Sequence, residues 1–115
     1  MRRGELWTVL DSGYAAKPPP ALIVQPQTPG DLESVILVML TTFDRPETPS
    51  RVAVEPTEAN GLRERSWVMA DKLLTVPKSY LGTRVGAVAD AELRAVSSAL
   101  AAVLGIGKDD IVSLQ

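Results

Sequence analysis

Short apolar runs, separated by turn-forming residues, occupy the first 88 residues of the chain. Runs of about four to eight residues that contain β-branched side chains are typical of strands. The prolines, glycines and Asn-Gly pair between them favour turns and loops. We therefore expect extended segments at residues 5–9, 21–24, 34–40, 51–54, 66–70, 72–76 and 85–88.

A helical period occurs only near the C-terminal end. Its apolar stripe consists of Leu93, Val96, Leu100 and Leu104. We expect Asp90 to be the N-cap of this helix and Gly105 to end it in the C′ position. Several short strands followed by one helix predict a mainly β, α+β domain: a small antiparallel barrel or curled sheet with the helix packed on it. The length fits a single domain over residues 1–115.

The composition excludes several classes of enzyme. The chain contains no cysteine and no histidine, which rules out disulfides, zinc–thiolate sites, cysteine nucleophiles and the Ser-His-Asp triad. A metal ion could bind only through oxygen ligands, and the acidic residues show no spacing typical of such a site. We expect neither a metal nor another cofactor.

The overall charge gives little indication of a partner. The formal net charge is −2, so nucleic-acid binding would need a local basic patch, for which Lys72, Lys78 and Arg84 are the clearest candidates. No apolar run reaches the roughly 18 residues of a membrane helix, and the N-terminal sequence turns polar too early for a signal peptide. We expect a cytoplasmic protein with no membrane association.

Six short motifs occur in an order that resembles a known family. They are RRGELW (2–7), PALIVQ (20–25), LTT (40–42), NGLRERS (60–66), DKLLTVPKSYLG (71–82) and ALAAVLGI (99–106). Together they resemble the MazF/PemK family of toxin–antitoxin ribonucleases over nearly the whole chain.

The resemblance implies a fold, an activity and partners. The fold would be a compact SH3-like antiparallel barrel with a C-terminal helix, as in MazF and CcdB toxins, assembled as a homodimer. The activity would be metal-independent, sequence-specific cleavage of single-stranded RNA, often mRNA, to 2′,3′-cyclic phosphate and 5′-hydroxyl ends. A cognate MazE-like antitoxin would wrap the dimer with a disordered C-terminal segment and block the RNA groove.

The family's catalytic pair is an arginine and a threonine. A guanidinium offers a rigid fork of donors to the charge that develops on a phosphoryl group, and a hydroxyl adds another donor. The threonine corresponds to Thr41, with Thr42 as the adjacent candidate. Alternatively, both threonines merely close a strand, a position that suits this residue type.

Pro19 stands where the family pattern KPRPALIVQ has its catalytic arginine. Proline has neither a charge nor a donor, so it cannot stabilise a phosphorane. Three interpretations are open. The chain could be an attenuated variant of a protein that has arginine there, or a naturally weak or inactive homologue. In the third interpretation Lys17 or another cation supplies the charge, although lysine lacks the bidentate fork.

Further candidates for RNA binding are Arg51, Asp71 and Lys72. Asp71 and Lys72 match an acidic-polar pair at the edge of the family's groove, but a solvated turn between two strands would explain them equally well. Arg51 opens a strand, where it could meet a phosphate or simply be an exposed edge arginine. Trp7 and Trp67 could stack on bases, although tryptophan in a small domain is more often part of the core.

Two alternative functions fit the same fold. One is a CcdB-like toxin that binds DNA gyrase, for which the end of the C-terminal helix would be functional. The segment 105–115 lacks the aromatic residue that such a site would favour. The other is a non-catalytic SH3-like module that binds a peptide strand, and Pro19 gives this alternative some weight.

Overall fold

The computed structural model describes residues 1–10, 20–27, 33–43 and 50–112. The elements are β1 (Glu5–Val9), β2 (Ala21–Ile23), β3 (Ser34–Thr41), β4 (Arg51–Val54), β5 (Ser66–Pro77), β6 (Leu81–Ala87) and α1 (Asp90–Leu104), with short 3-10 turns η1 (Lys78–Tyr80) and η2 (Lys108–Asp110). The expected mainly β architecture with one C-terminal helix is confirmed.

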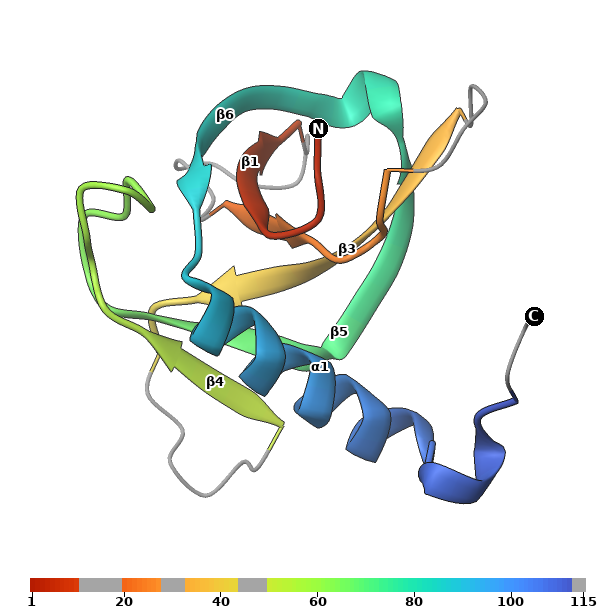
Figure 1. Ribbon diagram of the computed structural model, residues 1–115. Coiled ribbons are helices and arrows are strands. Elements are labelled where there is room, and N and C mark those ends of the chain that lie inside the picture. Colours follow the sequence, from red (N-terminus) through yellow and green to blue (C-terminus); the bar gives the residue numbers. More distant parts are fainter. Residues whose placement is uncertain (11–19, 28–32, 44–49, 113–115) are drawn as a thin grey trace.

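Six strands form one antiparallel sheet in the order β4-β5-β3-β2-β1-β6. The sheet curls so that β1 and β6 arch over β3 (Figure 1). In the described part of the chain β4 and β6 do not pair, so the sheet is open and not a closed barrel. The turn after β4 bridges the two edges instead, since the Ala87 N–H donates to the Ala59 carbonyl at 3.0 Å. Gly86 permits this approach, because a Cβ there would lie 2.4 Å from the Asn60 backbone.

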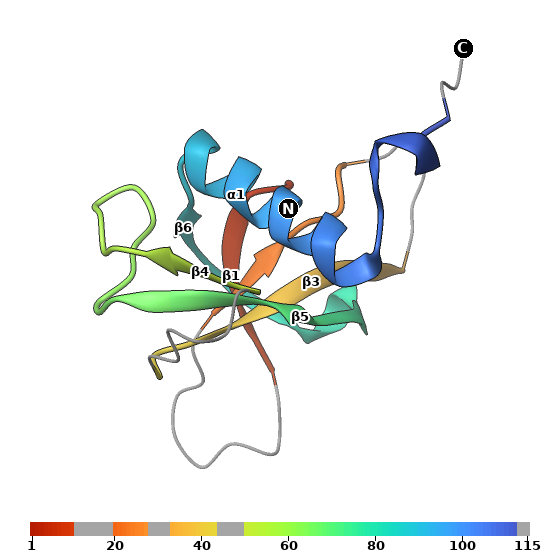
Figure 2. The same cartoon turned by 90° about the horizontal axis from the view of Figure 1, so that it is seen from below.

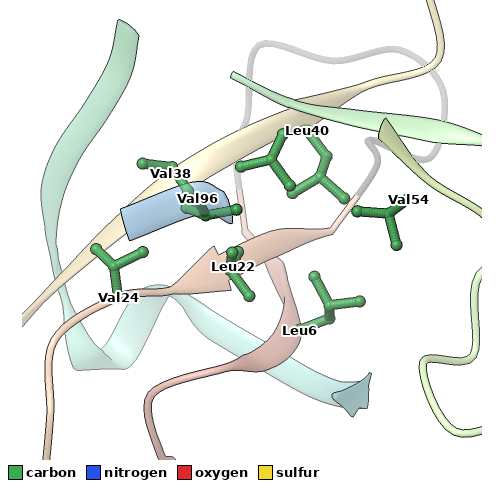
Figure 3. Packing of buried hydrophobic residues seen from close by; sticks show 8 residues of the cluster. Leu6, Leu22, Val24, Val38, Leu40, Val54 and Val96 are labelled. Carbon is green, nitrogen blue, oxygen red and sulfur yellow. The ribbon is translucent and has the colours of Figure 1, made fainter. Parts of the chain in front are cut away.

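Alternate residues of the strands fill two apolar clusters, as the two-residue period of a strand requires. The first cluster, between the curled sheet and α1, consists of Leu6, Leu22, Val24, Val38, Leu40, Val54, Val68 and Val96 (Figure 3). The second consists of Val9, Ala21, Ile23, Val35, Leu37 and Val76, with Trp7, Met39 and Leu81 packed against it. Burial of both faces explains why β3 is so continuously apolar.

Helix α1 lies across β4 and β5 (Figure 2). Val96 is fully buried, and Leu93 and Leu100 pack against the first cluster. The prediction that Leu104 completes the stripe is wrong, because this side chain is 54% exposed. The last turn of α1 runs past the strands that the helix covers (Figure 1), so the sheet offers it no surface.

The ends of α1 confirm one predicted cap and correct the other. Gly105 ends the helix in the left-handed conformation (φ 70°), which glycine adopts without steric cost. Asp90 is the first helical residue and not the N-cap, a position held by Ala89. The Glu92 carboxylate accepts a hydrogen bond from the Ala89 N–H at 3.0 Å, which satisfies a donor that the cap leaves open.

Strand β5 differs most from its prediction. Residues 66–77 form one strand and not two short ones, because the backbone stays extended through the exposed pair Asp71 and Lys72. The pairing with β3 changes register between Val38 and Leu40, and this irregularity absorbs the bend of the long strand. Strand β6 begins at Leu81, four residues before the expected start.

Candidate functional site

Thr41 is the last residue of β3 and lies opposite Trp67 of β5. The preceding pair, Leu40 and Val68, points into the first cluster, so Thr41 and Trp67 point to the other side of the sheet. The Phe43 N–H donates to Thr41 Oγ1 at 3.2 Å. Oγ1 is the acceptor in that bond, and among the described residues no acceptor takes the Thr41 hydroxyl hydrogen, which can therefore be donated to a ligand.

The same side of the sheet continues across β5 and β4. Trp67 pairs with Ala53, and Met69 pairs with Arg51. The residues that alternate with them along β5, Ser66, Val68 and Ala70, are buried on the core side. We call this surface the Thr41 face; it consists of Thr41, Arg51, Ala53, Trp67, Met69 and Asp71.

Three charged side chains, Arg51, Asp71 and Lys72, lie close together where β4 begins, at one end of the Thr41 face. Asp71 Oδ1 lies 3.9 Å from Arg51 Nε and Asp71 Oδ2 lies 3.9 Å from Lys72 Nζ. Asp71 Oδ1 also accepts a hydrogen bond from Ser50 Oγ at 3.2 Å. With two cations and one carboxylate, the group carries a net positive charge.

Arg51 has unused hydrogen-bonding capacity. Its side chain is only 12% exposed, and Nε is buried with no hydrogen-bond partner among the described residues. The nearest carboxylate oxygen, at 3.9 Å, is beyond hydrogen-bonding distance. A buried donor without an acceptor is unfavourable, so an anion that reached it would gain a ready partner.

Arg65 extends the polar surface at the other end of the face. Its guanidinium carbon lies 5.1 Å from the centroid of the Trp67 ring, within the range of a cation–π contact. Arg65 Nε also lies 2.6 Å from Glu55 Oε1. The sequence analysis did not single out Arg65, although a position two residues before Trp67 in an extended segment would have indicated a shared face.

Trp7 lies in a different environment, at the junction of β1 and β6. Its indole N–H donates to Glu5 Oε1 at 3.1 Å, and Glu5 Oε2 accepts from Arg84 Nε at 2.7 Å. Burial raises the pKa of the Glu5 carboxyl, but hydrogen bonds from Arg84, Trp7 and the Arg2 backbone outweigh it and lower this pKa to about 2. Arg84, one of the three residues of the predicted basic patch, is thus paired with Glu5.

The structure brings together some of the predicted site residues. Thr41, Arg51 and Asp71 share one face, and Lys72 adjoins it. The alternative that places Asp71 and Lys72 in a turn is wrong, because both lie within β5. The exposed-edge alternative for Arg51 is also wrong, because its side chain is mostly buried.

The remaining candidates are less informative. Thr42 is exposed just beyond the end of β3. Lys17 and Pro19 lie outside the described residues. Ala21 pairs with Met39, so the chain enters β2 at the end of the sheet where β3 finishes in Thr41. Within the described ranges, no three acidic side chains gather closely enough to hold a metal ion, and no helix is long and apolar enough to cross a membrane.

Comparison with known proteins places the chain in a family. Residues 2–104 match the family of PemK-like, MazF-like toxins of type II toxin–antitoxin systems. The chain is 41% identical over 107 residues to a probable endoribonuclease MazF of Mycolicibacterium smegmatis, covering 92% of this chain and 98% of that protein.

Solved structures agree with this match. An endoribonuclease in complex with its cognate antitoxin, from a mycobacterial species, has a TM-score of 0.77 and 34% identity, covering 93% of this chain and 97% of that chain. A second mycobacterial endoribonuclease has a TM-score of 0.75 and 31% identity, covering 92% of both chains. The chain belongs to the PemK-like, MazF-like toxins of type II toxin–antitoxin systems.

Proposed function

We propose that this toxin is an endoribonuclease that cleaves single-stranded RNA without a metal ion. The observation that carries the proposal is the Thr41 hydroxyl, which is anchored by the Phe43 N–H at a strand end and shares a face with the positively charged Arg51 group. The relatives that are 41% and 34% identical are both named endoribonucleases, which favours this activity over gyrase binding or a passive peptide-binding module.

The proposed reaction is an internal transfer at the phosphate. The ribose 2′-oxygen loses its proton and attacks the adjacent phosphorus, and the bond from phosphorus to the 5′-oxygen breaks. The 5′-oxygen takes up a proton, which leaves a 2′,3′-cyclic phosphate and a 5′-hydroxyl. Negative charge builds on the phosphoryl oxygens in the transition state, and the Thr41 O–H donates to one of them.

Cleavage by the chain as written should be weak. Pro19 stands where the family has its arginine, and a charged bidentate donor is the strongest partner for a developing phosphorane. Arg51 and Lys72 bind neighbouring phosphates and hold the RNA in place, while Asp71 orients the side chains of both cations. The same RNA would gain further contacts from Thr42, the residue after Thr41, and from Lys17.

The relatives and the exposed apolar residues also support two proposals about partners, an antitoxin and a second copy of the chain. The 34%-identical mycobacterial relative was solved with its cognate antitoxin, and we propose a MazE-like antitoxin whose C-terminal segment covers the RNA site here. We also propose a homodimer, since Ile36 on β3 and Leu73 on β5 lie on the same side of the sheet and are each 37% exposed. Light scattering at micromolar concentration should give about twice the monomer mass, and a clean monomer would contradict the dimer.

The test of the activity is a gel assay on mixed-sequence single-stranded RNA, scored for 2′,3′-cyclic phosphate ends. Pro19→Arg should raise cleavage by about 10²–10³-fold, the usual value of one preorganised donor. In that background Thr41→Ala should remove most of the gain, whereas Thr83→Ala, at an exposed threonine on β6, should not. Cleavage should survive EDTA.

Two outcomes would contradict parts of this proposal. If the chain as written cuts RNA as fast as its Pro19→Arg form, another cation supplies the charge. If neither protein cuts any RNA, the nuclease function itself is wrong.

A further inference from the structure

The two tryptophans of this chain differ in what holds them. Trp7 packs against the second apolar cluster and donates its indole N–H to Glu5 at 3.1 Å. Both side chains are partly buried, but Trp67 belongs to neither apolar cluster, and its indole N–H has no hydrogen-bond acceptor among the described residues. The fold therefore uses Trp7 as a scaffold residue and makes little use of Trp67.

The position of Trp67 relates it directly to the proposed reaction centre. Trp67 and Thr41 are facing residues of antiparallel strands. The Cβ atoms of such a pair lie about 4.5–5.5 Å apart on the same side of the sheet. The neighbour of Trp67 on its other side is Ala53, whose side chain is small and exposed.

Arg65 contacts the indole ring of Trp67, and a ligand could displace it. Its guanidinium lies 5.1 Å from the ring centroid, and its ion pair with Glu55 is exposed on both sides, at 53% and 64%. Exposed ion pairs contribute little free energy, so Arg65 can leave the ring at small cost. A guanidinium that stacks on an indole occupies the kind of surface that a nucleobase also fits, since both are flat and both favour the π face.

We propose that Trp67 stacks on an unpaired nucleobase next to the phosphate that Thr41 contacts, and that Arg65 yields the ring to this base. The inference rests on the proposed nuclease function and deepens it, because it states how the substrate is held. A base can insert against an indole only when its own face is free, so the site selects single-stranded over duplex RNA. Trp67 is thus a positioning residue, and Thr41 remains the catalytic group.

The first test measures affinity for a mixed-sequence single-stranded RNA with 2′-O-methyl groups, which removes the attacking hydroxyl. Trp67→Ala should weaken binding about 5- to 150-fold, the range for one stacked base. Trp67→Phe should keep most of the affinity. Inorganic polyphosphate, which carries the charge without bases, should bind Trp67→Ala as well as it binds the parent chain.

The second test uses fluorescence and does not need a truncated side chain at the site. Trp7→Phe leaves Trp67 as the only tryptophan, and the RNA should quench its emission. Trp67→Phe leaves only Trp7, whose emission should stay unchanged. Circular dichroism verifies that each variant is folded.

Several results would overturn the inference. If the parent chain binds RNA but Trp67→Ala binds it equally well, or if the lone Trp67 is not quenched, no base stacks there and the nuclease proposal still stands. If Trp67→Ala loses RNA and polyphosphate equally, the effect is one of charge or folding. If the parent chain and its Pro19→Arg form bind no RNA, the stacking site and the proposed function are both wrong.

Discussion

The junction of β1 and β6 and the Thr41 face each contain a tryptophan, an arginine and a carboxylate, yet they differ in how completely these groups are bonded. At the junction, Glu5 accepts hydrogen bonds from Trp7 at 3.1 Å, from Arg84 at 2.7 Å and from the Arg2 N–H at 2.6 Å. On the Thr41 face, the carboxylate of Asp71 lies 3.9 Å from Arg51, whose buried Nε has no hydrogen-bond partner in the described ranges.

This difference is a physical criterion that distinguishes residues that stabilise the fold from residues that can bind a ligand. Polar groups whose partners are all within the protein stabilise the fold and have nothing left to offer a ligand. Polar groups that are held in place but not saturated cost stability in the free protein and gain partners when a ligand binds. The same residue types therefore serve opposite purposes in two parts of one sheet.

The largest expected effect concerns the two tryptophans. Trp7→Ala should lower the free energy of unfolding by about 3 kcal/mol, because it removes packing against the second cluster. Trp67→Ala should cost only about 1 kcal/mol, the value of a cross-strand pair and an exposed cation–π contact. Urea denaturation of both variants measures the difference. Equal losses would mean that Trp67 is a scaffold residue too.

A somewhat smaller effect should follow from Glu5. Its pKa is lowered from 4.5 to about 2, so its contribution is complete above pH 4.5 and is lost as the pH falls towards 2. This contribution amounts to about 3 kcal/mol at most. Glu5→Gln should flatten the dependence of unfolding free energy on pH in that window, whereas exposed Glu58→Gln should leave the curve as it is. An unchanged curve for Glu5→Gln would show that the junction is no more tightly bonded than the Thr41 face.

The smallest effect extends the comparison to α1. Leu100 packs against the first cluster and Leu104, one turn later, is 54% exposed. Leu100→Ala should lower the free energy of unfolding by about 2 kcal/mol, and Leu104→Ala by less than about 0.5 kcal/mol. Thermal unfolding of the pair provides the measurement. A large loss at Leu104 would reveal that another surface covers this side chain in solution.

Local pattern in the sequence determined most of the architecture. The strands at Glu5–Val9 and Arg51–Val54 have their predicted bounds, and α1 ends at Gly105 as expected. These features depend on neighbours within a few residues, through side-chain period, turn formers and caps. The same local motifs, taken in order, resembled the family that the comparisons then established, and they placed Thr41 at a strand end.

Tertiary structure decided which of these residues meet. Thr41 lies opposite Trp67 and Arg51 is buried beside Asp71, both through strand register between distant segments. The sequence could not separate Trp7 from Trp67, because the pattern around each is equally compatible with core or surface. The difference comes from what lies across the sheet: Trp7 meets an apolar cluster and a carboxylate, and Trp67 meets a threonine and an alanine.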